Sequence, residues 1–152
     1  MTAYEVWLFL HISAVALWLG GAVVAQVFGA LAKASGEPAR SAAFGQDMAK
    51  VGPWVFMPAS LVVLVTGVAL VEDGNWEWGE AFVVLGLLGW ALVAFVGFGY
   101  VTRAMKATGI RMAAEGPTPA LAARIDRLVL VGRVLILVLF LVVLLMVVKP
   151  GT

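Results

Sequence analysis

Four long apolar runs, separated by short polar segments, dominate the pattern of positions along the chain. The runs cover residues 4–32, 51–71, 81–102 and 128–148, and each reaches the length of about 20 residues that crosses a hydrocarbon core of ~30 Å. Backbone polar groups in hydrocarbon must be satisfied internally, and the runs lack the polar alternation of barrel strands. The pattern predicts an all-α fold, a four-helix transmembrane bundle that forms a single integral membrane domain over residues 1–152.

The polar segment after the first run predicts a short additional helix. The turn signal "SGE" at 35–37 ends the first helix, and Pro38 can open a helix that runs to Lys50. Phe44 and Met48 fall on one side of that helix. We therefore expect a short interfacial helix in the first cytoplasmic loop.

Three further signals concern how the helices bend, begin and pack. Pro58 lacks a backbone donor and crowds the preceding turn, so a kink is expected in the second helix. Thr118 can cap the fourth helix with Pro119 at its first position, so this helix begins before its apolar run. Gly20 and Gly21 are small enough to permit a close contact between helices.

Composition leaves no room for a soluble domain beside the four runs. The chain is 63% hydrophobic and 12% charged, whereas a soluble domain is nearer half apolar and a quarter charged. The absence of cysteine excludes disulfides and thiolate metal ligands. The N-terminal "MTAYE" has no basic residue, and the first run is longer than a signal-peptide core of ~7–15 residues, so we expect it to stay as a span.

Basic residues gather in two of the polar segments. Eight of the ten follow the first and third runs: Lys33, Arg40, Lys50, Arg103, Lys106, Arg111, Arg124 and Arg127. The positive-inside rule then predicts a multi-pass protein of the cytoplasmic membrane with both termini outside. The net charge of +1 carries no information on nucleic-acid binding, and no nucleic-acid partner is expected. The expected partners are the lipid bilayer and a second copy of the chain or a larger membrane complex.

The single histidine lies inside the first apolar run. Ionisable groups within a membrane usually face the bundle and mark a site, so we expect His11 to point inward, near the outer end of the fourth helix around 142–146. Trp18 follows two turns deeper on the same face. A neutral imidazole is a good ligand for haem iron or copper. The structural alternative is a hydrogen bond from His11 to a neighbouring helix.

A second ligand to His11 is harder to find. Met146 is the only membrane methionine expected in the same leaflet. A haem between His11 and Met146, a five-coordinate haem and a pair of His11 side chains across a dimer all remain open. The candidate cofactor-binding residues are His11, Trp18 and Met146, with His11 as the candidate metal ligand.

Other polar residues favour simpler roles. Arg133 is expected to snorkel toward the cytoplasm, or else to pair with an acidic ligand. Glu72, Asp73, Glu77 and Glu80 match no calcium-loop spacing and indicate a solvated outer loop. No catalytic residues are assigned. A haem- or copper-binding accessory protein is the first hypothesis, a structural subunit without cofactor the second, and an enzyme the third.

Three short motifs resemble a bacterial family of predicted four-span integral membrane proteins, a domain of unknown function. They are a histidine followed by an aromatic residue and paired glycines (His11, Trp18, Gly20, Gly21), a Thr-Gly pair (Thr66, Gly67) and a Met-x-x-Lys-Pro ending (Met146, Lys149, Pro150). The first motif is also distantly similar to the membrane domain of copper resistance protein D, and to a haem-containing protoporphyrinogen oxidase whose first-helix histidine ligates haem. The second and third runs here hold neither lysine nor a second histidine. The resemblance thus implies a ligand role for His11 but no reaction.

Overall fold

The computed structural model describes residues 1–149, and every element in that range is helical. In chain order the elements are α1 (Ala3–Ala34), α2 (Pro38–Val51), the π-helical segment η1 (Gly52–Phe56), α3 (Met57–Asp73), α4 (Ala81–Ala94), the π-helical segment η2 (Phe95–Val101), α5 (Thr102–Glu115) and α6 (Pro119–Val148). Four continuous helices are long and apolar enough to cross a membrane, which confirms the all-α bundle. Pro150 of the C-terminal motif lies outside the described residues.

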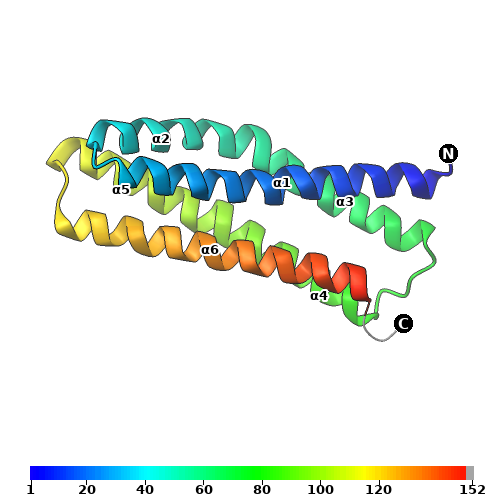
Figure 1. The fold of residues 1–152 in the computed structure, drawn as a ribbon. Coiled ribbons are helices and arrows are strands. Elements are labelled where there is room, and N and C mark those ends of the chain that lie inside the picture. The colour runs from blue at the N-terminus through cyan, green and yellow to red at the C-terminus, as the bar shows by residue number, and fades with distance from the viewer. Residues whose placement is uncertain (150–152) are drawn as a thin grey trace.

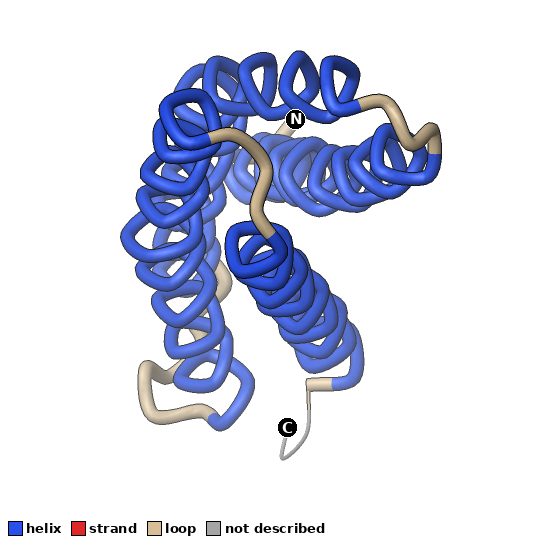
Figure 2. Tube along the Cα trace, turned by 90° about the vertical axis from the view of Figure 1, so that its left-hand side faces the viewer, coloured by secondary structure: helices blue, strands red, loops and turns tan. Residues whose placement is uncertain are grey.

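The four continuous helices run back and forth as an elongated bundle (Figure 1). One end holds the turns 35–37 and 116–118 and is called the basic end below; the N-terminus, the loop 74–80 and the last described residues lie at the opposite end (Figure 1). Within the bundle α1 packs mainly on α3, and α4 packs mainly on α6. Figure 2, viewed from the basic end, shows α6 lying beside both α1 and the α4–α5 helix.

The short helix expected after the first run is present but is not a separate element. Residues 38–51 form α2, which continues through η1 into α3 as one helix over Ala39–Asp73. It packs along α1 and also contacts α5. The predicted helix ends at Lys50, directly before Gly52 and Pro53, two residues that favour the end of a helix. The structure instead accommodates these two residues inside a π-helical turn.

That π-helical turn also interrupts the α-helix near the expected kink at Pro58. The N–H of Met57 bonds to the carbonyl of Gly52, five residues back rather than four. Pro53 follows the acceptor residue Gly52, and Pro58 follows the donor residue Met57. Neither proline has the backbone N–H that a regular α-helix uses for its hydrogen bonds. The second π-helical segment, η2, contains no proline and was not expected.

Only one of the paired glycines in α1 makes the predicted close contact. A Cβ at Gly21 would lie 2.6 Å from Cε1 of Phe56, so the ring rests directly on this backbone. Gly20 is exposed, with no atom within 4 Å of such a Cβ, and the expectation for it was wrong. Adjacent residues differ by about 100° around a helix, so only one of the pair can face the same neighbour.

The central core draws one layer from all four continuous helices. Its buried members are Trp18, Ala59, Val93, Leu135 and Leu139. Outside this layer, large apolar side chains cover the helix surfaces that point away from the bundle. A water-exposed surface of this kind would aggregate, whereas hydrocarbon is its natural surrounding.

Candidate functional site

The site around His11 begins with how α1 is anchored. The hydroxyl of Thr2 accepts the N–H of Glu5 at 3.3 Å, and the Glu5 carboxylate accepts the N–H of Thr2 at 2.8 Å. This capping box satisfies the first turn and fixes where the helix begins. His11 follows eight residues into the helix, about 12 Å from its start. It is partly buried and lies in the half of the bundle that holds the N-terminus, opposite the basic end.

His11 bonds to Thr66 of α3. Its Nδ1 lies 3.0 Å from the Thr66 hydroxyl oxygen, which is almost fully buried. That hydroxyl also lies 2.5 Å from the carbonyl of Val62, one turn earlier in α3. Two oxygens approach that closely only with the hydroxyl hydrogen between them, so Thr66 donates to Val62. We therefore assign the hydrogen of the other contact to His11, whose Nδ1–H donates to Thr66.

This assignment determines what the second ring nitrogen can do. A neutral imidazole carries one hydrogen, so with Nδ1 protonated the Nε2 atom has a free lone pair. Nε2 can then accept a hydrogen bond or coordinate a metal, while Thr66 holds the ring in orientation.

Gly67 makes room for the ring. A Cβ at this position would lie 3.3 Å from Cε1 and 3.7 Å from Nδ1 of His11. The Thr66–Gly67 pair therefore supplies both the hydrogen-bond acceptor and the space beside it. The sequence marks these two residues as a motif, but no sequence pattern pairs them with His11.

Trp18 lies deeper in the bundle than His11 and belongs to the central core. It is 5% exposed, and its ring stacks on Phe98 of η2 with centroids 6.4 Å apart. A second core tryptophan, Trp90, donates its indole N–H to the carbonyl of Ser60 at 2.9 Å. The core around Trp18 is thus tied together by ring contacts and one polar bond between α3 and α4.

Met146 lies in a different environment from His11. It packs on Gly86 of α4 and against the cluster formed by Val71, Phe82 and Val83. The hydrogen-bonding partner of His11 comes from α3, and the expected closeness of the ring to 142–146 of α6 stays a prediction. The described neighbours of the three candidates differ: Thr66 and Gly67 for His11, Phe98 for Trp18 and Gly86 for Met146.

Gln26 is a polar residue of α1 that was not among the predicted site residues. Its amide nitrogen lies 2.5 Å from where a Cβ of Gly132 would be, so the side chain reaches into α6. The signal was available, since Gln26 is an uncharged polar residue deep within an apolar run. Polar groups of this kind join helices in membranes.

The remaining charged candidates do not form a metal site. Among residues 1–149, no group of three His, Cys, Asp or Glu side chains could hold a metal ion. Glu72 and Asp73, expected in a solvated loop, instead form the end of α3, and Glu72 accepts the indole N–H of Trp78 at 3.0 Å. Arg133 is exposed on α6, and no acidic partner for it is found in the described part of the chain.

Together the four apolar helices and their polar connections place the chain among the helical integral membrane proteins. Residues 5–150 match the model of the family described as "predicted integral membrane protein (DUF2269)", and the chain belongs to this family. Neither a curated protein nor a solved structure matches this chain. The predicted membership in a family of integral membrane proteins of unknown function is therefore confirmed.

Proposed function

We propose that this protein is a small accessory protein of the cytoplasmic membrane that binds haem through Nε2 of His11. The observation that carries the proposal is the 3.0 Å contact between His11 Nδ1 and the Thr66 hydroxyl oxygen, in which we assign the hydrogen to Nδ1. Histidines that ligate metals characteristically donate their other ring nitrogen to an acceptor, which fixes the tautomer and the ring orientation. Thr66 provides that acceptor here.

The donor set fits haem better than copper. One axial histidine is enough to hold haem iron, as in five-coordinate haem proteins. Copper sites take several protein ligands, and His11 is the only imidazole that the chain supplies. The similarity of the first helix to the membrane domain of copper resistance protein D is the reason to test copper as well.

A second candidate function rests on a different aspect of the same bond. His11 and Thr66 link α1 to α3, the most closely packed pair of helices in the bundle. With no cofactor, the pair would act as an interhelical hydrogen bond in a structural subunit of a membrane complex. Such bonds contribute about 0.6–2 kcal/mol in membranes.

The orientation in the membrane follows from the charge distribution. The helix segments on either side of the turns at the basic end carry eight of the ten lysines and arginines, so we propose that this end faces the cytoplasm. Both termini then lie outside, and His11 occupies the outer half of the bilayer.

The test is haem reconstitution of the full chain in detergent, followed by absorption spectroscopy. We expect the purified protein to give a Soret band at a stoichiometry of one haem, and His11→Ala to lose it while staying folded. Ser13→Ala, which removes an exposed hydroxyl two residues further along α1, is the matched control and should keep the band.

The result also separates the two candidate functions. If neither haem nor copper binds the unaltered protein, and His11→Ala only lowers its thermal stability, the structural role replaces the proposal. If the Soret band survives in His11→Ala, another group ligates the haem and the assignment of His11 is wrong.

A further inference from the structure

A pocket rich in arginine lies at the basic end, between the end of α5 and the beginning of α6. It has a volume of about 430 Å³ and opens to the surface. Arg111 comes from α5, and Arg124 and Arg127 come from α6. Tyr100 of η2 and Thr118, the N-cap of α6, also line the pocket. Nothing in the proposed role of His11 involves this pocket.

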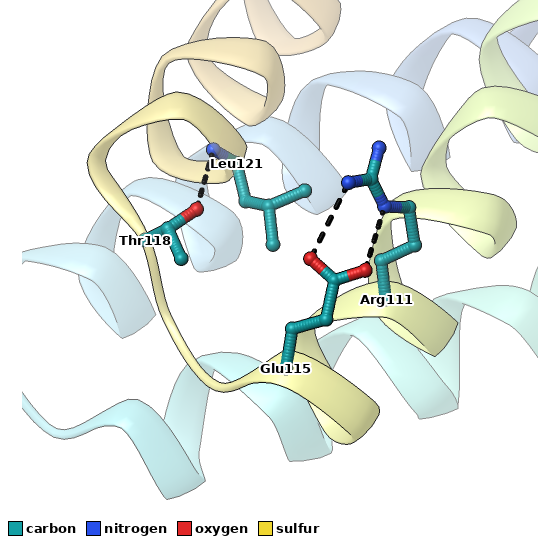
Figure 3. Close-up of polar contacts among 4 residues, drawn as sticks. All are labelled: Arg111, Glu115, Thr118 and Leu121. Atoms are coloured by element: carbon teal, nitrogen blue, oxygen red, sulfur yellow. Dashed lines mark hydrogen bonds and ion pairs between the residues drawn. The ribbon is translucent and has the colours of Figure 1, made fainter.

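The positive charge in the pocket is only partly balanced. Arg111 makes a two-pronged bond to Glu115, with nitrogen–oxygen distances of 3.2 and 3.3 Å (Figure 3). Asp126, which lies between the other two arginines in sequence, pairs instead with Lys33 of α1. Within residues 1–149, Arg124 and Arg127 have no carboxylate partner. The pocket therefore presents two uncompensated guanidinium groups.

The first turn of α6 adds further donors. The hydroxyl oxygen of Thr118 accepts the N–H of Leu121 at 3.3 Å (Figure 3), which leaves its own hydrogen free to donate. The positive end of the α6 dipole points the same way. Guanidinium groups match phosphate oxygens in a two-pronged geometry, so phosphate is the anion that this set of donors favours.

An exposed apolar stripe continues from the arginines along α6. Leu130, Val134, Leu137 and Leu141 follow Arg127 at alternating steps of three and four residues, and each is at least half exposed. This spacing keeps them on one face of the helix. The distance from Arg127 to Leu137 is about 15 Å, which matches one leaflet of a ~30 Å hydrocarbon core.

We propose that this pocket binds the phosphate headgroup of an anionic phospholipid, with an acyl chain lying along the stripe. A pocket for soluble phosphate would have no need of the apolar continuation. Basic pockets between helices on the cytoplasmic side of membrane proteins are suited to such headgroups. Glu115 does not oppose the ligand, because Arg111 already neutralises it.

Native mass spectrometry of the full chain in detergent tests the proposal by comparing phosphatidylglycerol with phosphatidylcholine. The unaltered protein should retain one phosphatidylglycerol molecule and bind it more tightly than phosphatidylcholine. The double variant Arg124→Gln/Arg127→Gln should bind it about tenfold more weakly or worse, because two charge-assisted contacts are lost. Arg124→Lys/Arg127→Lys keeps the charge but loses the two-pronged geometry, and should fall between the two.

The matched control is Arg103→Gln/Lys106→Gln in α5, which removes the same charge outside the pocket. It should change the affinity by about twofold at most, since screened charges act weakly at a distance. Equal losses in the two double variants would show general charge attraction and overturn the proposal. Displacement of the lipid by inorganic phosphate at comparable concentration would identify a site for soluble phosphate instead, which also overturns it.

Discussion

Replacing Gly21 with leucine tests the contact that brings α1 against the second helix. A Cβ at Gly21 would lie 2.6 Å from Cε1 of Phe56, whereas carbon atoms pack best at about 3.5–4.0 Å. The ring must therefore retreat by about 1 Å for the Cβ alone, and further for the rest of the leucine side chain. Inserting carbon atoms into a packed contact costs about 1–3 kcal/mol.

The same substitution at Gly20 isolates this cost. Gly20 precedes Gly21 in the same helix, and a Cβ there meets no atom within 4 Å. Both changes gain the same helix propensity over glycine, about 0.5–1 kcal/mol, so their difference reports the Phe56 contact. We expect Gly21→Leu to melt below Gly20→Leu by about 2–4 °C for each kcal/mol of overpacking, measured by circular dichroism in detergent.

A second variant confirms the cause. Phe56→Ala removes the ring, so Gly21→Leu in that background should cost much less than in the unaltered protein, with a coupling of about 0.5–3 kcal/mol. If Gly20→Leu and Gly21→Leu melt together, or if Phe56→Ala gives no relief, the contact does not hold the two helices and the reasoning fails.

Three further predictions use simpler measurements. Reporter fusions after Gly74 and Thr152 should be active outside and one after Gly116 inside, and a C-terminal reporter that reads inside would refute the orientation. Thr118→Ala removes the bond to the first turn of α6 and should cost about 1 kcal/mol, seen as a lower melting temperature; unchanged melting would show that the cap contributes nothing. Thr66→Val keeps the side-chain shape but removes the acceptor for His11, so unfolding in detergent should become easier by about 0.6–2 kcal/mol; equal stability would mean that the bond is not maintained.

The number of helices could be predicted because it depends only on the length and polarity of local segments. The continuity of the second helix could not, since hydropathy marks where a chain enters lipid and not where its helix ends. Residues 39–50 are too polar for a span, yet they stay helical in line with α3. The strong breaking signal at Gly52–Pro53 was absorbed by a π-helical turn, an outcome that local propensities do not describe.

The surroundings of His11 were predicted in part. Helical periodicity indicated that the ring faces inward, but periodicity does not say which helix it meets. Short connections place consecutive helices side by side, so Thr66 in the second run was a nearer candidate than Met146 in the fourth. The position of Met146 depends on the rotation of α6 against α4, where Gly86 leaves room for it, and no single-helix pattern contains that rotation.

The two π-helical segments divide the second and third long helices at a similar level. Counted from the loop between these helices, η1 and η2 lie about 25–30 Å along the axis at 1.5 Å per residue. A π-helical turn holds one extra residue, which rotates everything beyond it by about 100°. In each of these two helices, the rotational position of the side chains is therefore set separately on the two sides of the π-helical turn. One side lies in the half of the bundle that holds His11 of α1, and the other lies at the basic end. Single-residue insertions or deletions absorbed at these joints could re-aim the arginine end during evolution without disturbing the histidine end.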